Sequence, residues 1–595
     1  MESTSSRSAS ARLRGSLTLV LITISAGLIF GRILAVDSIP DRAVQEYRLA
    51  RIPQTLRDKA KELKKEGLSD DAVKARLKQT AARLRADALK ARPTLSANDR
   101  SRWLTIRALA EPESRVYRYL PLDADGSRKP RYAKGEILRN TPAGSPDSID
   151  TAANRSGTYL KEWVPYAVDK AMETPGWDTI DMVKHGLSDE EFDPADPYSG
   201  YLYSSKPTLL PTLMAGVYWV WLHATGLSLR EHPFLVARVL LVIYNLIPLT
   251  LGWFFMGRLI ERFGGDDEKT ADWAKFFAVG TLCFGTFLST FAVTLNNHLP
   301  GAAAIMISLY ATARILADGD SRTRYFFAAG LFGALAVACE LPAVLIALLV
   351  CLALLFRFPK KTLLVSVPAG LAVAAAFFGT NILAHGTFRP AYSQKRDHIA
   401  LAKAEHPTET DRFLVTSFDP NDWYIYRFFP GTAKRDPKNA RMSYWSDRQG
   451  VDRGEPSRAR YAFHALLGHH GLFSLSPILL LSVAGACIWL FRGPGTERRL
   501  FAGGVLLTAV FFFLFYVSRN QGDRSYGGMT CGLRWFFPLI PFWILTMLPA
   551  LDRLGRTRTG RAAALILLFL SAFSVAYPLW NPWSHPWILN LTFGR

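Results

Sequence analysis

The motif WDTID, in the hydrophilic first third of the chain, offers two carboxylates at a spacing that could serve chemistry. Asp178 and Asp181 lie three residues apart, so on a helix they would share one face. A carboxylate placed in this way can accept the proton of a hydroxyl group, or hold a metal ion that polarises it. A surface or capping role is the alternative for either aspartate, whereas the acidic run at 189–193 fits a solvated loop better. We therefore take Asp181 and Asp178 as the catalytic candidates.

Basic residues that could stabilise a phosphate group stand at two places in the sequence. Lys206 precedes Pro207, where the hydrophilic segment becomes apolar, and Arg534 ends a loop that also carries Arg524 and Tyr526. Lysine and arginine bind phosphate through charge-assisted hydrogen bonds. The alternative for Lys206 is snorkelling toward lipid headgroups, and for the arginines it is anchoring a helix end.

Two more ionisable residues stand beside or between apolar runs. His298 follows two asparagines at the start of one run, and Glu340 separates two others. Polar groups at membrane depth are costly and are therefore functional candidates by default. A histidine bonded to backbone and a structural acid paired with a base are the alternatives. The predicted substrate-binding set is thus Lys206, Arg534, Glu340, His298, Tyr526 and Arg524.

The composition indicates an all-α polytopic membrane protein. The chain has 595 residues, of which 49% are hydrophobic, and its second half consists largely of apolar runs. Those runs are roughly 17–25 residues long, which is the length that spans a bilayer. A helical bundle satisfies the backbone polar groups in lipid. Four of the five cysteines, at 283, 339, 351 and 487, lie inside apolar runs, so no disulfide framework is expected.

The net charge of +21 has two readings. Basic residues flanking membrane spans are attracted to anionic lipid headgroups, and they could also serve a phosphate-bearing or polyanionic substrate. The sequence contains neither a P-loop nor a G-x-G-x-x-G motif, so a nucleotide site is not indicated. No nucleic-acid partner is expected, because the most basic soluble segment is predicted to face away from the cytoplasm.

The chain divides by composition into alternating membrane and hydrophilic regions. A basic helical hairpin is predicted at 41–92 within the first long loop, with Ser69 capping its second helix. The regions are an anchor helix at 1–36, an extracytoplasmic loop at 37–206, a juxtamembrane or re-entrant helix at 207–230, a bundle at 231–384, a second extracytoplasmic loop at 385–471 and a C-terminal bundle at 472–595.

The distribution of basic residues predicts the topology. Arg7, Arg12 and Arg14 precede the first apolar run, and the short connections between later runs are basic at alternate positions. The positive-inside rule places these segments in the cytoplasm. This parity holds if residues 207–227 do not cross the bilayer, which gives about eleven transmembrane helices. The candidate residues then share the outer face of an inner (cytoplasmic) membrane.

Three stretches carry a resemblance to a known family. SSKPTLLPTLMAGVYWV resembles a juxtamembrane motif of the GT-C superfamily of membrane glycosyltransferases, with Thr208 where a second proline is common. RYFFAAGLFGALAVACELPAVLIALL is similar to that family's helix pair with a polar break, although Glu340 replaces a basic residue or a Thr-Lys pair there. YGGMTCGLRWFFPLIP resembles a late-loop motif, with Leu533 in place of proline. The resemblance covers roughly residues 160–550.

The resemblance implies transfer of a sugar from a polyprenyl-phosphate-linked donor to an extracytoplasmic acceptor. Membrane lipids and the lipid-linked sugar would be the partners, with Asp181 as the family's first-loop acid and a divalent cation as an optional cofactor. Two alternatives remain open. An O-antigen-type ligase or polymerase would use late-loop arginines and histidines without a required carboxylate, and a transporter or envelope scaffold would use the hairpin at 41–92 for interactions.

Overall fold

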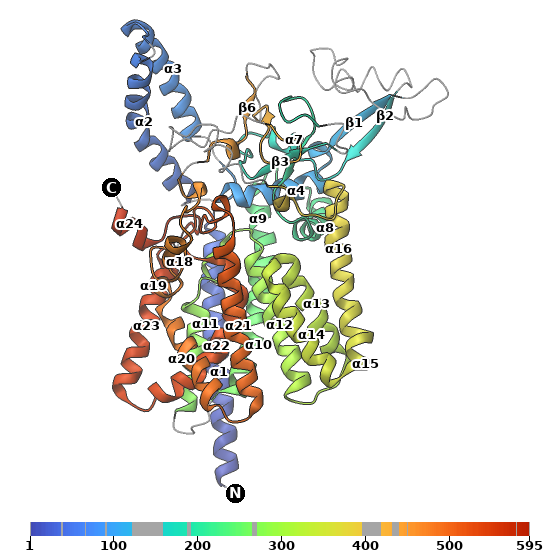
Figure 1. The fold of residues 1–595 in the computed structure, drawn as a ribbon, viewed down its shortest axis with the longest axis vertical. Coiled ribbons are helices and arrows are strands. Elements are labelled where there is room, and N and C mark those ends of the chain that lie inside the picture. The colour runs from blue at the N-terminus through green and yellow to red at the C-terminus, as the bar shows by residue number, and fades with distance from the viewer. Residues whose placement is uncertain are drawn as a thin grey trace.

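A computed structural model describes most of the chain. The described residues are 2–36, 40–65, 67–89, 92–121, 159–186, 192–264, 270–395, 418–430, 439–448, 450–578 and 580–593. The acidic residues at 189–191 therefore lie outside the described residues, as does 396–417 of the second long loop. Helices form a tall bundle, and a mixed region of helices and short strands covers the end opposite the N-terminus (Figure 1).

Seven helical segments within the described residues are long and apolar enough to cross a membrane. They are Leu13–Leu34, Pro233–Phe263, His298–Leu316, Pro359–His385, Thr496–Ser518, Arg534–Leu554 and Arg558–Ala576. Three shorter apolar helices accompany them at Thr323–Cys339, Leu341–Arg357 and Pro477–Arg492. The outer surface of the bundle is apolar: Phe356, for example, is 88% exposed. An apolar surface of this extent is that of a membrane protein, as predicted.

The bundle helices follow the chain in this order: α1 (Glu2–Leu34), α9 (Pro233–Leu241), α10 (Ile247–Phe263), α11 (Ala271–Phe284), α12 (His298–Leu316), α13 (Thr323–Cys339), α14 (Val344–Arg357), α15 (Pro359–Lys361), α16 (Val367–His385), α20 (Leu480–Arg492), α21 (Thr496–Ser518), α22 (Ile540–Leu554) and α23 (Arg558–Ala576). Single π-helical turns at Val242–Leu246 and Thr362–Ser366 join α9 to α10 and α15 to α16.

Polar contacts join the short basic connections at the end of the bundle where the chain begins. Arg14 of α1 forms an ion pair with Glu261 at 2.7 Å, and Lys361 contacts the backbone oxygen of Ser321. The guanidinium of Arg561 lies 5.8 Å from the centre of the Trp273 ring. Connections that the charge pattern predicted to share one side thus share one end of the structure (Figure 1).

The predicted basic hairpin is present as α2 (Pro40–Lys65) and α3 (Asp70–Leu89), which rise away from the bundle (Figure 1). Buried Leu63 and Val73 pack between the two helices, and Gly67 makes the turn with a φ of 76°. The hydroxyl oxygen of Ser69 accepts a hydrogen bond from the backbone N–H of Ala72 at 3.4 Å, so Ser69 caps α3 as predicted.

The hydrophilic region also contains short strands, so the protein is mostly but not entirely helical. Where the structure describes this region, three antiparallel pairs form: β1 (Val116–Pro121) with β2 (Tyr159–Val164), β3 (Met182–His185) with β4 (Tyr201–Ser204), and β5 (Arg427–Phe428) with β6 (Arg441–Met442). The other elements of this region are α4 (Ala97–Ala110), α7 (Asp169–Met172), α8 (Leu209–Thr225), α18 (Arg458–Leu466), α19 (Leu472–Leu475) and α24 (Trp587–Phe593).

Helix α4 lies where the mixed region meets the bundle (Figure 1). Ser96 caps its start by accepting the backbone N–H of Asp99 at 3.1 Å. Eleven of its fourteen residues are buried, among them Arg102 and Arg107. It packs on α8, which lies at the junction between the mixed region and the bundle (Figure 1). Buried arginines in a helix outside the bundle indicate a specialised site at this junction.

Candidate functional site

A cavity of about 1050 Å³ occupies this junction. Five of the predicted site residues line it: Asp181, Lys206, His298, Glu340 and Arg534. They come from positions spread over more than half of the chain, and the fold brings them to one end of the bundle. From this polar end the cavity continues as a groove between α13, α14 and α16.

Small and apolar side chains line this groove. Ala334 and Ala338 contribute from α13, Val350 from α14, and Ala374 and Phe377 from α16. The cavity therefore combines a charged head with an apolar tail region, and it is suited to an amphipathic ligand.

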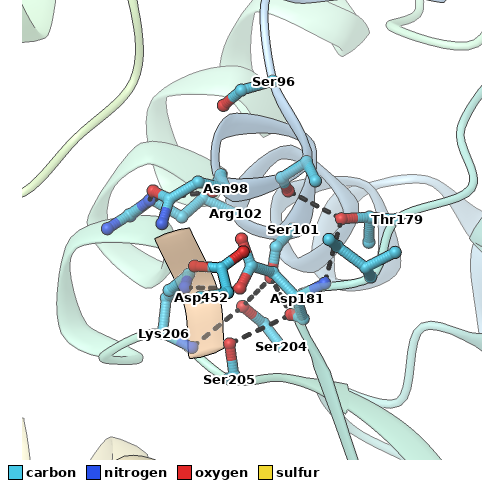
Figure 2. A network of polar contacts seen from close by, with 12 residues as sticks. Ser96, Asn98, Ser101, Arg102, Thr179, Asp181, Ser204, Ser205, Lys206 and Asp452 are labelled. Carbon is cyan, nitrogen blue, oxygen red and sulfur yellow. Dashed lines mark hydrogen bonds and ion pairs between the residues drawn. The ribbon is translucent and has the colours of Figure 1, made fainter. Parts of the chain in front are cut away.

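The pairing of β3 with β4 positions the catalytic candidate Asp181. Met182 lies opposite Ser204 in the register, so Asp181, directly before β3, lies close to Lys206, just beyond the end of β4. The Nζ of Lys206 donates to the Oδ1 of Asp181 at 2.9 Å (Figure 2). Burial lowers the pKa of Lys206, and the charge of Asp181 offsets part of that effect.

Hydroxyl groups hold the backbone of this corner. Ser101 of α4 and Ser205 donate to the backbone oxygen of Asp181 at 2.6 Å and 3.1 Å, and Thr179 accepts the N–H of Asp181 at 3.3 Å (Figure 2). These contacts connect α4 and the strand pair, so the carboxylate of Asp181 has a fixed location at the cavity wall.

The prediction that Asp178 and Asp181 share a helical face is wrong. The segment between α7 and β3 is not helical, and the two aspartates diverge. Asp178 lies outside the cavity lining and pairs with Arg92 at 3.2 Å. The helical spacing of two residues carries little weight where the surrounding residues lack a matching apolar pattern.

Arg102 of α4 is a cavity residue that the sequence did not reveal. Its Nε donates to the Oδ1 of Asn297 at 2.8 Å, and its Nη1 donates to the Oδ1 of Asn98 at 2.6 Å. The side chain is 4% exposed, and burial lowers its pKa to about 10, so the guanidinium is charged at neutral pH. Its hydrogen-bond partners are neutral, and the nearby negative charges act only at longer range.

Arg534 presents a second buried guanidinium. Its Nε donates to the Nε2 of His298 at 2.8 Å, its Nη2 donates to the backbone oxygen of Gly527 at 2.7 Å, and its Nη1 is buried without a partner in the described chain. The guanidinium carbon lies 4.6 Å from the centre of the Trp583 ring. Because Nε2 of His298 accepts a hydrogen bond, the proton of the neutral ring lies on Nδ1, which contacts Glu340.

A second carboxylate, Asp452, lines the same cavity from the second long loop (Figure 2). Its Oδ2 accepts the hydroxyl of Tyr444 at 2.9 Å. Burial is the main cause that raises its pKa, and the charge of Asp181 adds to this rise. The sequence did not predict Asp452 as a site residue, because it lies in a polar loop and carboxylates are common in such loops.

Two predicted residues lie near the cavity without lining it. Arg524 donates to three backbone oxygens, those of Glu455, Arg519 and Pro456, and so joins the two late loops. The ring of Tyr526 stacks on His470 with centroids 4.6 Å apart. Both residues lie where they can hold the loop that precedes Arg534.

The described residues contain no group of three or more histidine, cysteine, aspartate or glutamate side chains placed to hold a metal ion. A divalent cation would need several oxygen ligands, whereas Asp181 faces the ammonium of Lys206. The described residues around Asp181 therefore do not fit a resident metal ion. All five cysteines are free. Compared with known proteins, the chain matches no family model, no curated protein and no solved structure.

Proposed function

We propose that this protein is a multi-pass membrane glycosyltransferase, which moves a sugar from a polyprenyl-phosphate-linked donor to an acceptor at the outer face of the membrane. One observation carries the proposal. A single cavity holds a carboxylate and two buried guanidinium groups with neutral partners at one end, and an apolar groove at the other. The resemblance of three sequence stretches to the GT-C superfamily points to the same chemistry.

The donor fits the two ends of the cavity. Its phosphate would lie between Arg102 and Arg534, since a buried cation without a carboxylate partner gains most from a charged ligand. Its lipid tail would follow the groove beside α13, α14 and α16, whose outer faces are apolar. A ligand of this kind reaches the site from the bilayer without leaving it.

Asp181 would act as the base. It would accept the proton of the acceptor hydroxyl while that oxygen forms a bond to the anomeric carbon. The bond between the anomeric carbon and the phosphate oxygen would break, and its electron pair would remain on the phosphate. Arg102 and Arg534 would stabilise that charge, and Lys206 holds the carboxylate of Asp181 in place at 2.9 Å.

This function requires a defined orientation. We propose about eleven crossings, made by the seven long helical segments together with the shorter helices α11, α13, α14 and α20. The end that carries the cavity would face away from the cytoplasm of the cell's inner membrane. The position of α8 at the junction fits an interfacial helix, because α8 exposes Leu213, Trp219 and Val220 on one side.

The test is consumption of a polyprenyl-phosphate sugar by the purified protein in lipid nanodiscs. We expect Asp181→Asn to lower the transfer rate by at least about 100-fold while donor binding stays within a factor of two or so. Arg534→Gln should weaken donor binding and also lower the rate, because it removes a phosphate contact. Arg258→Gln, at the opposite end of the bundle, is the matched control.

The same assay separates the alternatives. Full transfer by Asp181→Asn would favour an O-antigen-type ligase or polymerase, which needs no carboxylate. Two results together would indicate a transporter or scaffold. The protein would consume no lipid-linked sugar, and deletion of 41–92 would abolish its cellular function with every acid intact.

A further inference from the structure

Asp452 and Trp445, both in the second long loop, line the cavity, and the proposed chemistry uses neither. Both residues are partly exposed. Figure 2 shows Asp452 beside Asp181 and Lys206, and the charges of both act on it. A residue this close to the proposed base also lies close to the sugar whose anomeric carbon would react there.

Trp445 ties this loop to the segment that carries Asp181. Its Nε1 donates to the backbone oxygen of Ile180, the residue directly before Asp181, at 3.0 Å. Farther along the loop, the backbone N–H of Glu455 donates to the backbone oxygen of Arg524 at 2.9 Å. Contacts at both ends therefore hold this part of the loop at the cavity wall.

Asp452 offers one carboxylate oxygen to a ligand. Its Oδ2 accepts the hydroxyl of Tyr444 at 2.9 Å, which fixes the orientation of the carboxylate. No described residue donates a hydrogen bond to Oδ1, and this oxygen keeps accessible surface, so it is open at the cavity wall. A carboxylate oxygen accepts hydrogen bonds from hydroxyl groups, and such bonds are stronger than those between neutral groups.

The loop that holds Arg534 passes close to the Oδ1 of Asp452. A Cβ at Gly528 would lie 3.3 Å from this oxygen. The adjacent residue, Gly527, accepts the Nη2 of Arg534 on its backbone oxygen at 2.7 Å. The second long loop therefore reaches both the segment that carries the proposed base and the loop that holds a proposed phosphate-binding arginine.

We propose that Asp452 accepts a hydrogen bond from a hydroxyl group of the transferred sugar and so selects the sugar of the donor. This inference rests on the proposed function. The anomeric carbon is bonded to the phosphate, which Arg102 and Arg534 would bind, and it must lie within reach of Asp181. The ring hydroxyls then lie near the open oxygen of Asp452. A sugar without the matching hydroxyl would leave this carboxylate without its partner and would bind more weakly.

Affinities for lipid phosphates with and without a sugar test the inference, in the full-length protein in nanodiscs. The probes are undecaprenyl phosphate and its glucosyl, mannosyl and arabinosyl esters. At least one ester should bind about tenfold or more tightly than undecaprenyl phosphate, which is the effect of one hydrogen bond to a charged group. The ratio of the two affinities is the readout, because a defect in folding or in phosphate binding affects both ligands alike.

Variants connect the preference for the sugar to Asp452. Asp452→Ala should lower the ratio to about threefold or less, whereas Asp447→Ala, in the same loop but outside the cavity lining, should keep it. Asp452→Asn, which keeps the size of the side chain, should lower the ratio in the same direction and decides the question if the alanine variant does not fold. One monodeoxy analogue of the preferred ester should bind the wild type about tenfold more weakly than the parent ester, and bind Asp452→Ala equally well.

The inference is overturned if no ester is preferred over undecaprenyl phosphate, or if both Asp452 variants keep the preference. Loss of transfer in Asp181→Asn beside either of these results would leave the proposed function standing and remove the sugar contact of Asp452. Retained transfer in both Asp181→Asn and Arg534→Gln would instead remove the proposed function, and the inference with it.

Discussion

At the scale of single residues, the site is defined by how each charge is partnered. Asp181 has a cation beside it, whereas Arg102 and Arg534 are held by neutral groups. The two charges of an ion pair neutralise each other. A buried guanidinium that is hydrogen-bonded only to amides and an imidazole keeps its net positive charge, which can then attract an anionic ligand. The contact of Glu340 with His298 is a positioning device, because it selects the ring tautomer that accepts from Arg534.

The environment of Asp452 predicts a pH dependence of stability. Burial raises its pKa, so the folded protein holds this proton more tightly than the unfolded chain. The stabilising contribution is complete below the ordinary carboxyl pKa of about 3.9 and is lost as the pH rises through the raised value. Asp452→Asn stays neutral, so its unfolding temperature in detergent should exceed that of the wild type by more at pH 7.5 than at pH 4.

Asp523 is the matched control, because its shift has the opposite sign. Asp523 is half-buried; desolvation acts to raise its pKa, but the ion pair with Lys395 at 2.9 Å outweighs this and lowers the pKa. Its contribution is present above the ordinary carboxyl pKa and is lost as the pH falls. Asp523→Asn should therefore be less stable than the wild type at pH 7.5, with a difference that shrinks toward pH 4. A stability difference for Asp452→Asn that is constant with pH would contradict this account of its burial.

At the scale of elements, sequence patterns identified the polar residues that interrupt apolar runs. They did not identify the site residues that lie in the hydrophilic segments. His298 and Glu340 were predictable because a charge stands out in an apolar run. Arg102 and Asp452 were not, since charged residues are ordinary in hydrophilic segments and only the tertiary fold brings these two to the cavity wall. Strands β3 and β4 are each four residues long, which is too short for an alternating apolar pattern to predict them.

The loop before α22 positions Arg534 through a glycine. Gly527 has a φ of 92°, and a Cβ there would lie 3.0 Å from the Nη1 of Arg534. We expect Gly527→Ala to weaken donor binding by about tenfold and to cost about 1–2 kcal/mol of stability for the left-handed backbone. Gly319→Ala is the control, because Gly319 has a φ of 66° in open space. Equal effects of both substitutions on donor binding would show that backbone strain alone is responsible.

The groove predicts a dependence on the length of the lipid tail. Ala374 on α16 lines the groove, whereas its neighbour Ala375 is exposed on the outer surface of the bundle. Ala374→Trp should fill the groove and raise the KM for a long-chain donor by about tenfold or more, with little effect on a donor of one or two isoprene units. Ala375→Trp should leave both KM values unchanged. If the KM values of Ala374→Trp for the two donors match those of the wild type, the lipid tail does not bind in this groove.

At the scale of the whole molecule, the charge pattern and the structure agree on which connections share one end of the bundle. The connections with basic residues share the end of the bundle that carries Arg14, and the residues from both long loops gather at the other end. Hydropathy and charge could predict this arrangement because they act over whole segments. They could not predict which loop residues meet, since that depends on the packing of α4, β3, β4 and the late loops against one another.

The central claim is that Asp181 and Arg534 face one cavity on the non-cytoplasmic side. Labelling of single cysteines with a membrane-impermeant maleimide in intact cells, in a background without the native cysteines, tests it most directly. Ser205→Cys and Met529→Cys line the cavity near these two residues, and Ser321→Cys lies at the opposite end of the bundle. We predict that the first two are labelled from outside, that a polyprenyl-phosphate sugar protects both, and that Ser321→Cys is labelled only after lysis. Labelling of Ser205→Cys and Met529→Cys from opposite sides of the membrane would contradict the account.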